Sequence, residues 1–114
     1  MTLQEFKHKL QNKPATIDFS ETIAVIEDNY NFTPSAFKNG VLENEVSQNQ
    51  GSCKVFSFAI QEGLTQEETL ACFGQYYAEV VNEPNGTGHQ NIRNFMNTGF
   101  EGLSFENETL TRKS

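Results

Sequence analysis

The segment 51–54 has residue types that nucleophilic chemistry requires. It reads Gly-Ser-Cys-Lys, so the Cys53 thiol lies next to the Lys54 ammonium group. A neighbouring cation and a helix start both favour the thiolate, which is the reactive form of cysteine. The free amides of a helix start, together with the small Gly51 and Ser52, would also suit a carboxylate or phosphate. The alternative is that Cys53 is a small buried apolar residue, as free cysteines commonly are.

The segment 89–93 supplies groups that could work with that thiol. His89 and Arg93 are four residues apart, which puts them on one face of a helix. A thiol, an imidazole and an amide are the groups of a cysteine hydrolase, so Cys53, His89 and Asn91 are the catalytic candidates. The alternative for His89 is structural: a residue at a helix start whose ring is held by a hydrogen bond.

Fixed positive charges are scarce in the middle of the chain. Between residues 39 and 111 the sequence has two Lys or Arg residues, Lys54 and Arg93, and ten glutamates. We therefore expect each cation to have a specific partner, which is either a glutamate or helix end that it stabilises or a bound anion. The second alternative makes Ser52, Lys54 and Arg93 the ligand-binding candidates, for a small anionic ligand.

The composition narrows the class of protein. The chain has 114 residues and a formal net charge of −7, and 36% of its residues are hydrophobic, with ten phenylalanines among them. These values predict a single folded domain over residues 1–114, and they leave the oligomeric state open. The negative charge argues against nucleic acids and anionic membranes as partners. No metal, cofactor, signal-peptide or membrane-span pattern occurs, so we expect a cytoplasmic protein without a cofactor, in which Cys53 and Cys72 are free thiols.

Apolar spacing predicts about five helices. Apolar residues recur at steps of three and four, and the expected helices cover residues 3–12, 18–29, 53–62, 65–83 and 89–97. The pair Asn39-Gly40 predicts a hairpin turn, and residues 103–105 are expected to form a strand beside that hairpin. Residues 111–114 are expected to fray. The expected fold class is α+β, a helix-rich single domain with a small antiparallel sheet or hairpin.

An ordered set of motifs resembles the HopJ type III effector family. The set covers nearly the whole chain and is more specific than any single motif. The matching stretches are Phe32-Thr33-Pro34, Phe37, Asn39-Gly40, Asn44, Asn49, residues 51–56, residues 69–74, Tyr76-Tyr77, residues 89–96, residues 99–103 and Phe105. The departures are Val46-Ser47, where a small residue and glycine are expected, Phe100, where tryptophan is expected, and Ala78, where a basic residue is usual.

The resemblance implies a bacterial protein that is translocated into a host cell, and it brings no reaction or catalytic residues with it. Three hypotheses follow. The protein is an effector that acts by binding a partner protein. Alternatively, it is a resident bacterial protein that binds a small anion near Cys53, Lys54, His89 and Arg93. The third hypothesis is an enzyme that uses the Cys53 thiol.

Overall fold

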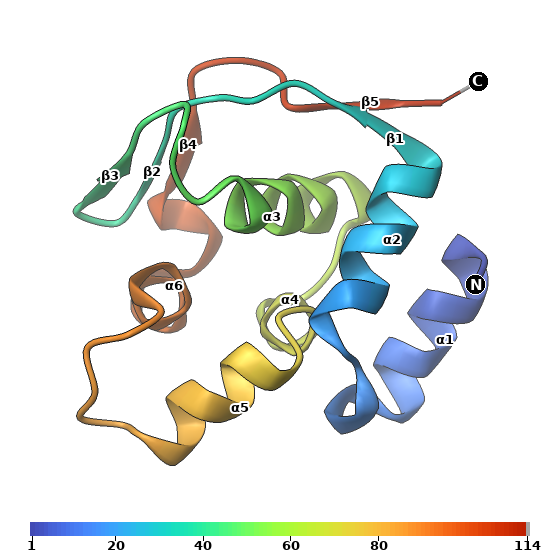
Figure 1. The fold of residues 1–114 in the computed structure, drawn as a ribbon, viewed down its shortest axis with the longest axis horizontal. Coiled ribbons are helices and arrows are strands. Elements are labelled where there is room, and N and C mark those ends of the chain that lie inside the picture. Colours follow the sequence, from blue (N-terminus) through green and yellow to red (C-terminus); the bar gives the residue numbers. More distant parts are fainter. Residues whose placement is uncertain (114) are drawn as a thin grey trace.

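The computed structural model describes residues 1–113 and confirms the α+β fold class (Figure 1). Six α-helices, two short 3₁₀-helices and five strands lie within these residues. The helices are α1 (Leu3–Asn12), η1 (Pro14–Thr16), α2 (Phe19–Asn29), α3 (Gln50–Glu62), α4 (Gln66–Ala71), α5 (Gln75–Asn82), α6 (Gln90–Thr98) and η2 (Gly99–Gly102). The strands are β1 (Tyr30–Phe32), β2 (Phe37–Asn39), β3 (Leu42–Asn44), β4 (Leu103–Phe105) and β5 (Leu110–Arg112).

The strands form two small antiparallel sheets on one side of the fold. One sheet has the order β3-β2-β4, and the other pairs β1 with β5. Asn39 pairs with Leu42, which confirms the expected hairpin, although the two turn residues are Gly40 and Val41. The strand expected at residues 103–105 is also confirmed, because β4 pairs with β2.

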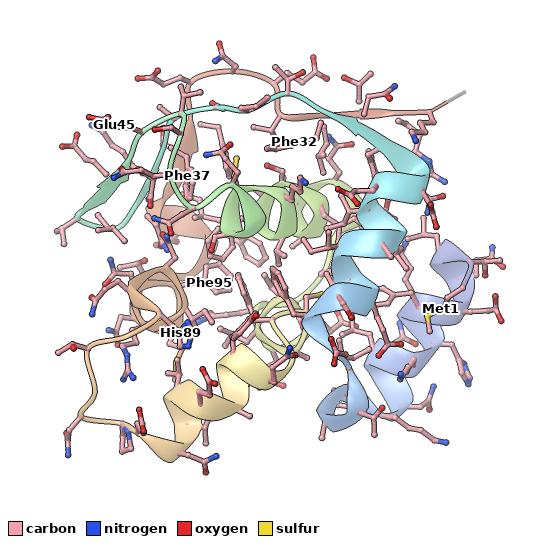
Figure 2. All side chains as sticks on the ribbon, in the orientation of Figure 1. Met1, Phe32, Phe37, Glu45, His89 and Phe95 are labelled. Carbon is pink, nitrogen blue, oxygen red and sulfur yellow. The ribbon has the colours of Figure 1, made fainter. Side chains whose placement is uncertain are left out.

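The central element is α3, which lies between the strands and the helices α4, α5 and α6 (Figure 1). Phe56 is fully buried, and its ring contacts the rings of Phe37, Phe73 and Phe95 at centroid distances of 6.3, 5.4 and 4.9 Å. Phe37 and Phe95 point towards α3 from β2 and α6 (Figure 2). Such aromatic pairs contribute about 0.5–1.5 kcal/mol each beyond their burial. The contacts of Phe56 therefore fix the surrounding elements against α3.

Five of the six α-helices begin in one of two ways. α1, α2 and α4 start with capping boxes, in which a Thr or Asp side chain and a Glu three residues later satisfy backbone N–H groups. The residue pairs are Thr2 with Glu5, Asp18 with Glu21, and Thr65 with Glu68. α3 and α6 begin instead after Asn49 and His89, which have left-handed backbones and whose side chains form no capping hydrogen bond. The first amides of α3 and α6 therefore have no internal acceptor.

The prediction of a single helix over residues 65–83 is wrong, because the helical conformation is interrupted at Gly74. α4 ends at Ala71 and α5 begins at Gln75, and Gly74 between them has φ 57° and ψ −127°. A Cβ atom at Gly74 would lie 2.6 Å from the Phe19 backbone nitrogen. Only glycine permits both that conformation and that close approach. The break brings the start of α5 against the start of α2.

The expected ends of two other elements also need correction. Residues 111–112 do not fray but belong to β5, where they pair with β1, and Ser114 lies outside the described residues. The helix expected over residues 53–62 is confirmed, but it begins three residues earlier, at Gln50. No helix in the described part of the chain is long and apolar enough to cross a membrane.

Candidate functional site

A pocket of about 560 Å³ lies where the starts of α3 and α6 meet α2 and α5. Its volume is in the range of small-molecule binding sites. Its polar side is formed by Asn49, Ser52, Gln90 and Asn91, from the two helix starts. The lining also includes the rings of Phe19, Phe73, Tyr76 and His89. The pocket therefore combines residues from segments that are far apart in the sequence.

The start of α3 presents free amides to this pocket. Asn49 has φ 52° and ψ 41°, and its carbonyl oxygen accepts from the Cys53 N–H at 3.0 Å. The amides of residues 50–52 precede that bond, so the helix itself offers them no acceptor. Gly51 and Ser52 both line the pocket. An αL residue followed by αR residues also groups successive N–H groups into a concavity that suits an anion.

The start of α6 repeats this geometry on a neighbouring wall. His89 has φ 54° and ψ 52°, and its carbonyl oxygen accepts from the N–H groups of Ile92 and Arg93 at 3.0 and 3.1 Å. The amides of Gln90 and Asn91 come before these bonds and have no acceptor in the helix. Each helix start carries roughly half a positive elementary charge, so the two starts together favour negative charge in the pocket.

Four asparagine side chains, of which Asn39, Asn44 and Asn91 are buried, hold the two helix starts together. Asn44 Oδ1 accepts from Asn49 Nδ2 at 2.7 Å and from Asn91 Nδ2 at 3.0 Å. Asn39 Nδ2 donates to the Asn91 backbone oxygen at 2.7 Å, while Asn39 Oδ1 is buried without a partner among the described residues. Each amide in this network is neutral. The network therefore fixes the separation of the helix starts without placing a charge beside the pocket.

Four rings form the aromatic side of the pocket. The Phe19 ring lies 6.2 Å from that of Phe73 and 5.1 Å from that of Tyr76, and Tyr76 lies 5.3 Å from the His89 ring. Figure 2 shows His89 between α6 and α5. Its Nε2 atom contacts Glu79 Oε2 on α5 at 2.5 Å, which holds the ring in place. The wall is thus continuous from α2 through α5 to α6.

The lining of the pocket lacks acidic side chains. None of the residues that line it, all within residues 1–113, is Asp or Glu, although the chain has 15 acidic residues. Glu79 lies next to the lining and is engaged by His89. An anion in the pocket would therefore meet the two helix starts without a facing carboxylate.

Three of the residues expected from the sequence line this one pocket. They are Ser52, His89 and Asn91. Lys54 is not among the lining residues: its Nζ atom pairs with Glu27 Oε2 at 3.1 Å and lies 4.9 Å from the Phe32 ring centroid. Lys54 thus takes the structural alternative of a cation paired with a glutamate.

Arg93 also lies outside the pocket lining and holds a loop. Its Nε atom donates to the Gly88 carbonyl oxygen at 2.6 Å, and its Nη1 atom donates to the Pro84 carbonyl oxygen at 3.4 Å. Both acceptors belong to the connection between α5 and α6. Arg93 therefore fixes the loop that leads into the His89 turn, and the expected meeting of Lys54 and Arg93 at one anion does not occur.

The structure argues against an activated Cys53 thiol and favours the buried alternative. Cys53 is fully buried in α3, and burial raises the pKa of its thiol to about 11. Its sulfur lies 4.0 Å from the Ser35 carbonyl oxygen, and Lys54 on the neighbouring position points to Glu27. Burial also raises the pKa of the Cys72 thiol, to about 12. Both cysteines are core residues, so Cys53 fits the alternative interpretation as a small buried apolar residue.

The residues that sequence reasoning missed are Phe19, Tyr76 and Asn44. Phe19 and Tyr76 have ordinary helical spacing, which does not separate core rings from rings that line a pocket. The abundance of asparagine, 12 of 114 residues, was the available signal for Asn44. Among residues 1–113, no group of three or more His, Cys, Asp or Glu side chains could hold a metal ion.

Comparisons with known proteins place the chain in a family. A family model described as HopJ type III effector protein matches residues 3–110. The crystal structure of a protein of unknown function, VPA0580, is similar to this chain, with 52% sequence identity and a TM-score of 0.96 over 99% of this chain and 95% of that one. No curated protein matches the sequence. The family match covers nearly the whole chain and confirms the resemblance, so the chain belongs to the HopJ type III effector family.

Proposed function

We propose that this protein binds a small ligand through a negatively charged oxygen group held between the starts of α3 and α6. The observation that carries the proposal is the convergence of two helix starts, neither capped by a side chain, on one pocket without an acidic lining residue. Free amides and aligned peptide dipoles are what carboxylates and phosphates bind at helix starts. In α1, α2 and α4, by contrast, a capping box already satisfies two backbone N–H groups at the helix start.

The expected affinity is moderate. A favourable charge at one helix start contributes about 0.3–1 kcal/mol, and up to about 2 kcal/mol where the site is partly buried. Hydrogen bonds to a charged group contribute about 1.5–3 kcal/mol each. Two helix starts and the Ser52 hydroxyl group could therefore supply a useful binding energy even though no Lys or Arg among the described residues lines the pocket.

A substitution that fills the anion position tests this proposal. Ser52 occupies the third position of α3, where a glutamate carboxylate can reach the free amides of the same helix start. Ser52→Glu should therefore keep or raise the melting temperature and abolish binding of inorganic phosphate and acetate. The matched control is Ser104→Glu on the exposed face of β4, which adds the same charge away from the pocket.

Binding is measured by isothermal titration and by the shift of the melting temperature, because a ligand that binds only the folded state stabilises it. The proposal requires that the unmodified protein and Ser104→Glu bind the anions and that Ser52→Glu does not. Equal responses in all three proteins, or no response in the unmodified protein, would overturn it.

The family match favours a second function, delivery into a host cell as a type III effector. We propose that an effector of this kind acts by binding a partner protein. A reporter enzyme fused to the C-terminus of the full chain tests delivery. We expect reporter activity in host cells that depends on a working type III secretion system. Equal activity from a secretion-deficient strain, or none from the competent strain, would reject this role.

A further inference from the structure

We infer that the ligand is an aromatic oxyanion, with its ring against the aromatic wall and its anionic group at the helix starts; this inference rests on the proposed function. The pocket has two chemically different sides. The two helix starts supply free amides, and Phe19, Phe73 and Tyr76 supply rings. A molecule that satisfies both sides at once needs an anionic group joined to an apolar group.

The aromatic wall favours a flat ring over a bulky aliphatic group. Phe19 and Phe73 are near parallel, with an interplanar angle of 17°, whereas Tyr76 stands at 64° to Phe19. A planar guest can therefore meet rings in two orientations, chiefly those of Phe19 and Tyr76, because Phe73 is buried. Offset and edge-to-face contacts between rings contribute about 0.5–1.5 kcal/mol beyond area burial, which an aliphatic group of equal size does not gain.

Gly51 lets the α3 backbone pack directly against the ring of Phe19. A Cβ atom at Gly51 would lie 3.2 Å from Phe19 Cζ, so a larger residue would press on the wall from the α3 side. The α3 backbone can thus come close to the ring of Phe19. This arrangement puts the free amides of α3 within the same small space as the aromatic wall, as a ligand with an anion attached directly to its ring requires.

A cation is the competing occupant of an aromatic wall, because ring faces attract ammonium groups. The electrostatics of the pocket argue against it. Two helix starts carry partial positive charge, no lining residue of the described chain is acidic, and the nearby Glu79 is engaged by His89. A cation would therefore bind without a counter-charge.

Three matched small molecules distinguish the contribution of the anionic group to binding from that of the planar ring. Benzoate has a planar ring and a carboxylate, cyclohexanecarboxylate keeps the charge without planarity, and benzamide keeps the planar ring without the charge. Choline serves as the cation. We expect benzoate to bind about two- to tenfold more tightly than cyclohexanecarboxylate, which corresponds to the contribution of one aromatic pair. Benzamide should bind more weakly than both carboxylates, and choline should not bind.

Two substitutions in α5 test whether the preference for benzoate over cyclohexanecarboxylate depends on the aromatic lining of the pocket. Tyr76→Leu removes a wall ring, so benzoate should lose its advantage over cyclohexanecarboxylate. Tyr77→Leu is the matched control, because Tyr77 is on the same helix and lines a different pocket. If Tyr76→Leu does not fold, as judged by its thermal transition, Phe19→Leu takes its place.

The outcomes distinguish this inference from the proposed function. Equal binding of benzoate and cyclohexanecarboxylate, with both abolished in Ser52→Glu, would overturn the aromatic class and leave anion binding standing. Absence of binding by every carboxylate would overturn both. Binding of choline or benzamide in preference to benzoate would reject both in favour of a different ligand. A benzoate preference that Tyr77→Leu keeps and Tyr76→Leu loses supports the inference.

Discussion

The side-chain amides of Asn44 and Asn91 bond to each other in both directions. Asn91 Nδ2 donates to Asn44 Oδ1 at 3.0 Å, and Asn44 Nδ2 donates to Asn91 Oδ1 at 3.3 Å. Asn44 Oδ1 also accepts from Asn49 at the start of α3. One neutral side chain at the end of β3 therefore joins the two helix starts that form the polar side of the pocket.

Removal of that side chain should destabilise the fold. Asn44→Ala leaves the buried Asn91 Nδ2 without its acceptor, while Asn91 Oδ1 still accepts from Asn39 Nδ2 at 3.0 Å. An unsatisfied buried polar group costs about 1–3 kcal/mol. We expect a loss of about 2–3 kcal/mol in the free energy of unfolding, measured with urea. Asn97→Ala, an exposed substitution in α6, is the control and should change stability by less than about 0.5 kcal/mol. Equal effects of the two variants would contradict the bridging role of Asn44.

Glu62 should make stability depend on pH in the acid range. Burial raises the pKa of the Glu62 carboxyl, but bonds from Lys7 and Tyr30 and the charge of Arg112 outweigh burial, so the pKa lies below its usual value. A carboxyl with a lowered pKa stabilises the fold above its unfolded-state pKa, and that contribution is lost as the pH falls through the folded-state value. Glu62→Gln should cost about 2 kcal/mol at pH 7 and much less near pH 3.

The control for Glu62 is an exposed ion pair. Glu43 and Lys38 approach to 3.6 Å on the surface of the hairpin, and such pairs contribute little. Glu43→Gln should therefore change the free energy of unfolding by less than about 0.5 kcal/mol at either pH. A Glu62→Gln cost that is the same at pH 7 and pH 3 would show that the carboxylate charge is not the stabilising feature.

Gly74 should tolerate no side chain. Gly74→Ala must adopt a backbone conformation that non-glycine residues avoid, and its Cβ atom would meet the Phe19 backbone at 2.6 Å. We expect a loss of about 2–5 kcal/mol, from strain and overpacking together. Gly63→Ala also has positive φ but meets nothing within 4 Å, so it should lose only about 1–2 kcal/mol. If the two variants lose equal stability, the close approach to Phe19 does not matter.

Cys53 should be inert in the folded protein. With a thiol pKa of about 11, roughly one molecule in 10⁴ carries the thiolate at pH 7, and the sulfur is fully buried. Alkylation at neutral pH should therefore be far slower than that of a small model thiol and should become fast in denaturant. Rapid modification of Cys53 under native conditions would restore the thiol chemistry that the structure argues against.

Sequence patterns predicted the features that local chemistry determines. The expected helix starts at residues 18 and 65, the helix over residues 53–62 and the hairpin at Asn39-Gly40 each depend on residues within a few positions of one another. Helical spacing also identified α6 and most of α3. These parts of the fold follow from short-range hydrogen bonds and periodicity.

The missed features depend on contacts between distant segments. β5 forms because residues 110–112 pair with β1, about 80 residues earlier in the sequence. The helix interruption at Gly74 depends on the close approach of the Phe19 backbone. Sequence proximity also misled the site prediction: Lys54 follows Cys53 in the chain but projects from α3 towards Glu27. Ser52, His89 and Asn91 were found because they belong to the helix starts themselves.

The most direct test of ligand binding at the two helix starts is the amide spectrum of the ¹⁵N-labelled protein during titration with benzoate. The amides of residues 50–52 and of Gln90 and Asn91 should shift first and most, and they should saturate with one dissociation constant. The same titration of Ser52→Glu should leave those amides in place. Shifts spread over the surface, or confined to another pocket, would contradict the proposal that this pocket holds the ligand.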